Sequence, residues 1–367
     1  MLIKNNLLKF YMILISVLII VFFSACSQSD IKPKTQIGDT SKEEKINGVY
    51  LKSMNNFYIG DSADNQSLIH AYTPVDSKNT PIIMIPGLGL GANIYESTPD
   101  NRNGWAYDFL KRGYTVYTVN TSDLVSAGIS ESETQANFSK WDSKSIWLRW
   151  GLGPEPNKAY DNGKFPVESF EQFYSAIPMQ IKEISNIKTT DTGGIENLGI
   201  KGDSSGGRKS TTISKGGESS TGSSRANQQE VENMIKLLEK TGPAILLVHS
   251  MGGEIGYEVT RRRPDLVKGI VAIEPVGSPT EEKEIKEIFS EVLYLGIYGD
   301  YLESRNQVNR FKAVERTVEL INDQGGQAKV IRLTEENING NSHLMMLDKN
   351  SSEISNMIID WLDKVIK

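Results

Sequence analysis

The sequence predicts an α/β domain in which helices cover both faces of a mostly parallel sheet. Short continuous apolar runs, typical of strands buried on both faces, alternate along the chain with amphipathic helical segments. One apolar run ends in a serine and is followed by glycines that open a helix, in the stretch LLVHSMGGEI at 246–255. For a chain of 367 residues, one domain with a long insertion accounts for this pattern better than two domains do.

The first half of the predicted domain consists mainly of strands. Strand-like runs lie at 48–54, 55–60, 67–74, 80–87 and 114–120. A helix at 104–113 is closed by glycine. Residues 138–187 follow the last of these strands and are predicted to form a cap.

The second half alternates more regularly between helix and strand. Helices closed by glycine, by proline or by the end of the chain are predicted at 231–242, 252–264, 305–326 and 351–366. Buried strands are predicted at 243–250, 267–275, 291–300 and 328–334. This alternation indicates parallel pairing, because a helix returns the chain to the edge where the next strand begins.

Two polar segments interrupt the pattern. Residues 26–46 have no apolar period and are predicted to be a flexible tether before a domain at 47–367. Residues 188–228 are rich in Gly, Ser, Thr and Lys and cannot bury enough apolar surface to offset the entropy of ordering. We predict a disordered surface insertion there; a functional loop is the alternative.

Composition excludes several classes of protein. The chain is 38% hydrophobic and 23% charged, with a net charge of −6, which is ordinary for a globular protein. Because it has no basic patch, we expect no nucleic-acid partner. The single cysteine, Cys26, excludes an intramolecular disulfide and a cysteine-rich metal site.

The N-terminus has the pattern of an export signal. Lysines precede an apolar run at 10–23, which is shorter than the roughly 20 residues of a spanning helix. Residues 23–26 resemble a bacterial lipobox, which implies that residues 1–25 are a lipoprotein signal peptide and that Cys26 is lipidated. We expect an exported protein anchored to a membrane through Cys26, facing the periplasm or the cell exterior; an uncleaved membrane anchor is the alternative.

Ser250 stands where a buried strand turns sharply into a helix, which is the arrangement of a nucleophile elbow. Gly252 and Gly253 let that helix approach the strand without a clash. The N-terminus of the helix directs free N–H groups toward any oxyanion formed there. The elbow usually reads Gly-x-Ser-x-Gly, and here Val248 replaces the first glycine. We predict that Ser250 is a nucleophile.

The base can be sought among only three histidines. His249 adjoins Ser250, where its ring cannot turn back onto the hydroxyl group, and His70 lies in an early strand. His343 follows the last strand and precedes the closing helix, where a base belongs in the chain order serine, acid, histidine. We therefore predict His343 as the general base.

Two carboxylates are candidates for the acid that orients His343. Asp300 follows the strand that usually carries this acid, and Glu274 follows the strand before it. Asp300 also fits an ordinary turn, whereas an acid at the end of a buried strand, such as Glu274, needs a partner. Spacing alone does not decide between them.

The glycine-rich stretch MIPGLGLG at 84–91 follows the strand before the first helix. Gly87 and Gly89 let the backbone approach a substrate, so the N–H groups of Leu88 and Met251 are the predicted oxyanion donors. A plain turn is the alternative interpretation of this stretch.

Four separated stretches carry a family resemblance: PGLGLGANIYESTPDNRNGWAYDFLKRGYTVYTVN, TGPAILLVHSMGG, GIVAIEP and NGNSHLMMLDKN. Together, over residues 48–187 and 229–366, the chain resembles a group of bacterial α/β-hydrolase-fold esterases, many of them exported. The resemblance implies an α/β-hydrolase fold and a Ser-His-Glu triad, with Glu274 as the acid and Asp300 in reserve.

Three tryptophans mark the predicted cap. Trp141, Trp147 and Trp150 recur at a spacing that suits the lining of an acyl pocket. Packing of the cap onto the sheet is the alternative.

These observations together predict a carboxylic-ester hydrolase that forms an acyl-enzyme on a small-molecule ester and needs no metal or cofactor. A lipase, thioesterase or amidase would use the same triad. A surface lipoprotein that keeps the fold without catalysis is the alternative from another class. The sequence leaves the substrate, its acyl length and the oligomeric state open.

Overall fold

The computed structural model describes residues 48–62, 66–78, 80–131, 137–182 and 227–366. The predicted signal peptide, Cys26, the tether at 26–46 and nearly all of the insertion at 188–228 lie outside these ranges.

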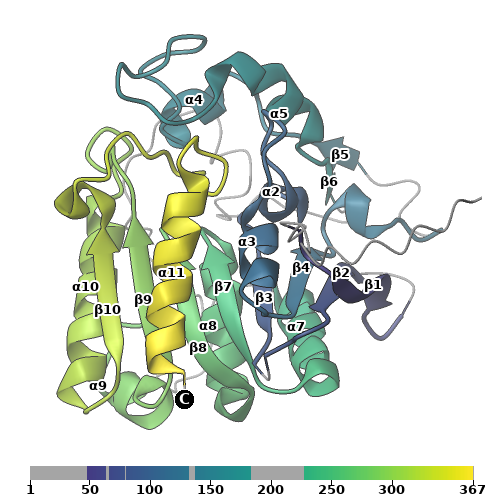
Figure 1. The fold of residues 1–367 in the computed structure, drawn as a ribbon, viewed down its shortest axis with the longest axis vertical. Coiled ribbons are helices and arrows are strands. Elements are labelled where there is room, and N and C mark those ends of the chain that lie inside the picture. The colour runs from purple at the N-terminus through teal and green to yellow at the C-terminus, as the bar shows by residue number, and fades with distance from the viewer. Residues whose placement is uncertain (1–47, 63–65, 79, 132–136, 183–226, 367) are drawn as a thin grey trace, which may run out of the picture. The chain divides into compact units, whose positions relative to one another are not determined.

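One sheet of eight strands organises the domain, in the order β1-β2-β4-β3-β7-β8-β9-β10 (Figure 1). The strands are β1 (Leu51–Ile59), β2 (Ser67–Pro74), β3 (Ile82–Ile85), β4 (Val116–Asn120), β7 (Ala244–His249), β8 (Val267–Ile273), β9 (Leu293–Tyr298) and β10 (Ala328–Arg332). β2 pairs antiparallel with β1 and with β4, and all the other neighbours are parallel. The sheet is therefore mostly parallel, as predicted.

Helices cover both faces of this sheet (Figure 1). α3 (Trp105–Lys111) and α11 (Ser351–Val365) lie on one face, and α7 (Gln228–Thr241), α8 (Gly252–Arg262) and α10 (Val308–Asp323) lie on the other. Because side chains alternate between the faces of a strand, Met84 and Leu247 belong to one buried cluster and Ile83 and Leu246 to the other. The predicted architecture is thereby confirmed.

Shorter elements complete the described part of the chain. They are α2 (Asn93–Glu96), η1 (Val125–Ala127), β5 (Asn137–Ser139), α4 (Ser145–Arg149), η3 (Val167–Ser169), α5 (Phe170–Ala176), β6 (Gln180–Lys182), η4 (Pro264–Leu266), α9 (Glu282–Glu284), the π-helical turn η5 (Ile285–Phe289) and η6 (Leu333–Glu336).

The segment that contains β5, α4, α5 and β6 lies over the carboxyl ends of the parallel strands (Figure 1). Among the hydrogen bonds that fix it there, two lie at the loops of the candidate site residues. The Trp141 indole donates to the Leu88 carbonyl at 2.9 Å, and the Trp150 carbonyl accepts from the His343 N–H at 2.8 Å. We call residues 137–182 the cap segment.

Two of the differences from the predicted boundaries have a clear physical cause. The runs at 48–54 and 55–60 form one strand, β1, because Asn55 and Asn56 stay in register with β2 instead of turning. Helix α7 begins at Gln228, three residues before the predicted start, because the Asn227 side chain caps it by accepting from the Gln229 N–H. Within the ranges described, no helix has the length and apolar character needed to cross a membrane.

Candidate active site

Ser250 lies between β7 and α8 with a φ of +50°, a conformation that is strained for a residue with a side chain. Neighbouring backbone groups hold it there. The Ser250 N–H donates to Ile273 O at 3.0 Å, and the Ser250 carbonyl accepts from the Val276 N–H at 2.8 Å. The elbow is therefore fastened to both sides of Glu274, which follows β8.

The two glycines after Ser250 are required by close packing. A Cβ at Gly252 would lie 2.7 Å from the Pro86 carbonyl oxygen and 2.8 Å from that of Ile85. A Cβ at Gly253 would lie 2.8 Å from the Val276 carbonyl oxygen. Helix α8 thus begins against the backbone that follows β3 and β8, which is the close approach that the sequence predicted.

Gly252→Ala is expected to destabilise the protein by about 1–3 kcal/mol, since the added methyl group meets backbone oxygens that cannot rotate away. Gly256→Ala in the same helix is the matched control. Its new Cβ would meet one side-chain methyl group, Val248 Cγ1 at 2.7 Å, and its next neighbours are side-chain atoms 3.8 Å away, so no backbone atom has to shift. Chemical denaturation measures both variants; an equal or larger loss for Gly256→Ala would contradict this account.

His343 and Glu274 form a buried pair. His343 Nδ1 lies 2.6 Å from Glu274 Oε2, and the two side chains are 5% and 1% exposed. Because an ionised carboxylate only accepts, Nδ1 carries the hydrogen and donates it. The His343 Nε2 atom is then the unprotonated nitrogen, which is the form a general base needs.

Arg305 completes this pair from the other side. Its Nη2 donates to the same Glu274 Oε2 at 2.7 Å, and the other carboxylate oxygen accepts from the Gly299 N–H at 3.0 Å. Burial would raise the pKa of Glu274, but the charge of Arg305 and the hydrogen bond from His343 outweigh it and hold that pKa well below its ordinary value.

The same surroundings keep His343 neutral. Burial first, and then the positive charge of Arg305, lower the pKa of His343 to about 4, against the opposing effect of Glu274. At neutral pH the imidazole is therefore unprotonated and able to accept a proton.

Asp300, the reserve acid, binds backbone instead of an imidazole. Its carboxylate accepts from the Asn341 N–H at 3.1 Å, and its own N–H donates to Asn341 O at 2.9 Å. Among the described residues, no hydrogen bond joins Asp300 to His343. Asp300 thus fixes the loop two residues before the histidine, whereas Glu274 contacts the imidazole.

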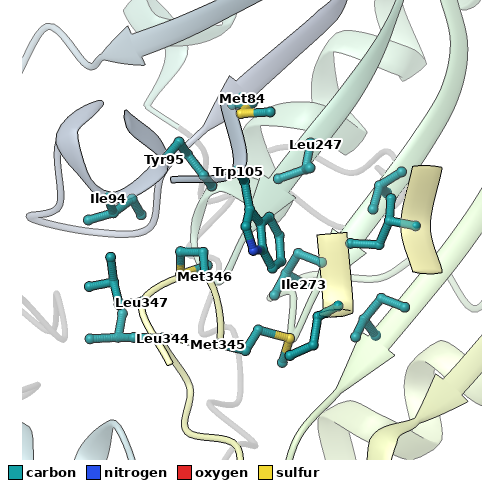
Figure 2. Packing of buried hydrophobic residues seen from close by; sticks show 14 of the residues in the cluster. Met84, Ile94, Tyr95, Trp105, Leu247, Ile273, Leu344, Met345, Met346 and Leu347 are labelled. Atoms are coloured by element: carbon teal, nitrogen blue, oxygen red, sulfur yellow. The ribbon is translucent and has the colours of Figure 1, made fainter. Parts of the chain in front are cut away.

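The loop that carries His343 is anchored on both sides. The buried Asp348 carboxylate accepts from the Ser342 N–H at 2.8 Å, from the Ser342 hydroxyl at 2.7 Å and from the Asn341 amide at 3.0 Å. Leu344, Met345, Met346 and Leu347 insert into the core near Trp105 and Ile273 (Figure 2). His343 consequently has a fixed backbone.

The other two histidines have different surroundings. The His249 Nε2–H donates to the His343 carbonyl at 2.9 Å, and the two rings lie 4.4 Å apart, so His249 joins the elbow to the His343 loop. His70 on β2 contacts Glu96 at 2.6 Å, in a polar cluster with Tyr72 and Thr118.

The Gly-rich loop after β3 lies beside the elbow. A Cβ at Gly87 would be 3.0 Å from Ser250 Cβ. Gly89 has a φ of +66°, and a Cβ there would be 2.5 Å from the Trp141 indole nitrogen. Within the part of the chain that the structure describes, no hydrogen bond uses the N–H of Leu88 or of Met251. These two N–H groups are therefore available next to Ser250.

The three cap tryptophans are buried, each less than a tenth exposed. Trp141 contacts the loop of Leu88, and the Trp150 backbone contacts that of His343. The Trp141 and Trp150 rings lie 5.4 Å apart, and Trp147 packs on Phe170 at 4.8 Å within the cap segment. The lining of an acyl pocket by these residues stays a prediction.

Sequence reasoning did not find Arg305 or Asp348. The one signal for Arg305 was that Glu274 ends a buried strand and needs a partner, but this requirement does not say which cation supplies it. Arg305 lies 31 residues away, and Asp348 acts only through the fold of its loop.

Comparisons with known proteins support the same fold. The chain matches no model of a known protein family. It is 26% identical over 376 residues to the "Probable secreted lipase phiG" of Fungal sp. (strain ATCC 74256), covering 84% of this chain and 89% of that protein. The solved structure of "a Novel Bacterial Esterase" covers 91% of this chain and 99% of its own, with 21% identity and a TM-score of 0.67. The chain has the α/β-hydrolase fold.

Proposed function

We propose that the protein is a carboxylic-ester hydrolase with Ser250 as the nucleophile, His343 as the general base and Glu274 as the orienting acid. The observation that carries this proposal is the buried hydrogen bond between His343 Nδ1 and Glu274. That bond leaves Nε2 unprotonated, on a loop that His249 ties to the serine elbow.

In the proposed reaction, Ser250 Oγ attacks the ester carbonyl carbon and its proton passes to His343 Nε2. The carbonyl oxygen becomes an oxyanion and accepts hydrogen bonds from the N–H groups of Leu88 and Met251. Collapse of this intermediate expels the alcohol, which takes the proton from His343. Water then attacks the acyl-enzyme by the same route, which releases the carboxylic acid and restores Ser250.

Two further features support an ester as the substrate and export as the destination. The relative at 26% identity is named a probable secreted lipase, and the structural relative is an esterase. In the N-terminal sequence, Ser24, Ala25 and Cys26 directly follow the apolar run at 10–23. We accordingly propose export, with a lipid on Cys26 as the membrane anchor.

A substrate panel tests the reaction class. The panel holds p-nitrophenyl esters from acetyl to palmitoyl, together with a thioester and an anilide of one shared acyl group. We expect faster turnover of the ester than of the matched thioester and anilide, because the sequence relative is named a lipase and the structural relative an esterase. A preference for emulsified long-chain esters would identify a lipase. A folded protein that turns over no member of the panel would favour the non-catalytic lipoprotein.

A further inference from the structure

Arg305 is a buried cation at the candidate active site. No step of the proposed reaction uses it. We propose that Arg305 is a positioning residue that locks the Glu274 carboxylate against His343 and keeps that histidine available as a base in acid solution. This inference rests on the proposed roles of Ser250, His343 and Glu274.

Hydrogen-bond donors hold both oxygens of the Glu274 carboxylate. Arg305 Nη2 and His343 Nδ1 donate to the same oxygen, Glu274 Oε2, at 2.7 and 2.6 Å. The second carboxylate oxygen is held by the Gly299 N–H at 3.0 Å. With both oxygens bound, the carboxylate cannot rotate away from the imidazole. His343 is thus held in the orientation that directs Nε2 away from Glu274.

The guanidinium group is itself held at a second point. Arg305 Nε donates to the Arg149 carbonyl at 3.1 Å, and Arg149 ends helix α4 of the cap segment. The side chains of Arg305 and Glu274 are each 1% exposed, so water and salt do not screen their interaction. Arg305 therefore connects the cap segment to the base–acid pair.

The charge of Arg305 also acts on His343. A buried positive charge beside Glu274 opposes protonation of His343, because imidazolium and guanidinium repel each other at short range in a medium of low dielectric constant. The cations Arg149 and Arg310 also face this region, with Arg310 acting on His343 in the same direction. Within the described ranges, the other titratable groups that interact with the pair are His249, Tyr298, Asp300 and Asp348.

The sign of the pH effect follows from these charges. A general base works only when it is unprotonated, so kcat/KM falls as pH drops through the pKa of His343. With that pKa lowered to about 4, activity persists well below the ordinary histidine range near 6.5. If Arg305 were uncharged, the same limb of the pH profile would move to higher pH.

The test compares the pH profiles of Arg305→Met, Arg305→Lys and the wild type, with kcat/KM expressed per active site counted by fluorophosphonate titration. Arg316→Met is the matched control, since it removes an exposed arginine of α10 whose one ion pair within the described part of the chain is with Glu319. The acid limb of the profile is the pH range in which kcat/KM falls as pH is lowered. We expect the midpoint of this acid limb to move up by about 1–2 pH units in Arg305→Met. It should stay near the wild-type position in Arg305→Lys, with a lower plateau, and be unchanged in Arg316→Met.

An acid limb that does not move in Arg305→Met would overturn the proposal, whatever happens to the plateau, because a merely structural role lowers the plateau alone. Should Arg305→Met fail to fold, the wild-type profile still decides, since a wild-type limb near pH 6.5 would contradict a base held neutral by Arg305. A wild type that neither labels nor turns over ester at any pH would instead refute the proposed function.

Discussion

Ser250→Ala is expected to lower kcat/KM on p-nitrophenyl esters by about four orders of magnitude or more, because it removes the only atom that attacks the carbonyl in the proposed reaction. Residual turnover would come from the oxyanion donors and from substrate binding. Folding should be unaffected, since the backbone at position 250, with its φ of +50°, is fixed by hydrogen bonds that do not involve the hydroxyl group.

Ester kinetics and thermal denaturation measure these two expectations together. Ser290→Ala is the control, because Ser290 directly follows the turn η5 and its hydroxyl donates to the Lys286 carbonyl of that turn. A Ser250→Ala protein that melts normally and retains activity within tenfold of the wild type would rule out Ser250 as the nucleophile.

Glu274→Gln is expected to lower kcat by about three to four orders of magnitude. A glutamine can present its amide N–H to His343 Nδ1, which favours the tautomer with the proton on Nε2 and removes the base. The substitution also leaves Arg305 buried without a counter-charge, so we expect a lower melting temperature as well. Rates are therefore measured per mole of folded protein, at a temperature where the variant is folded.

Asp300→Asn is the matched comparison, since it makes the same change in the reserve acid. An asparagine oxygen can still accept from the Asn341 N–H, so we expect a loss of less than about tenfold. A larger loss for Asp300→Asn than for Glu274→Gln would reverse the assignment of the acid.

Much of the fold is predictable because buried parallel strands have continuous apolar sequences. β3, β7 and β8 have nearly every residue buried, so their runs stand out without any knowledge of the tertiary structure. β1 is mostly exposed, and its polar residues Asn55 and Asn56 gave no sign that the strand continues through them. The length of β1 is set by its pairing with β2, and the residues of β1 alone do not predict that pairing.

The residues of the candidate site also fall into two groups: those that the local sequence identifies and those that depend on contacts across the fold. Ser250 is marked by its own neighbours, and His343 by its place among few histidines. Glu274 and Asp300 could not be separated by spacing, because the choice depends on which carboxylate reaches the imidazole in space. Arg305 and Asp348 carry no local mark, since each acts across the fold on a group that another element positions.

The cap tryptophans show where a pattern is ambiguous in principle. Their spacing fits a pocket lining and a packed interior equally well. What distinguishes Trp141 is the position of one acceptor, the Leu88 carbonyl, which its indole reaches from the cap segment. That contact depends on how the cap segment packs over the strand ends. The spacing of residues within the segment does not predict this packing.

The most direct measurement of the central claim is labelling of the purified protein by a fluorophosphonate probe, with the modified peptide located by mass spectrometry. The probe reports only whether a serine is activated, so it needs no knowledge of the natural ester. We predict labelling at Ser250 in the wild type, none in Ser250→Ala and strongly slowed labelling in His343→Ala. A folded wild type that stays unlabelled, or that carries the label on another serine, would contradict the account.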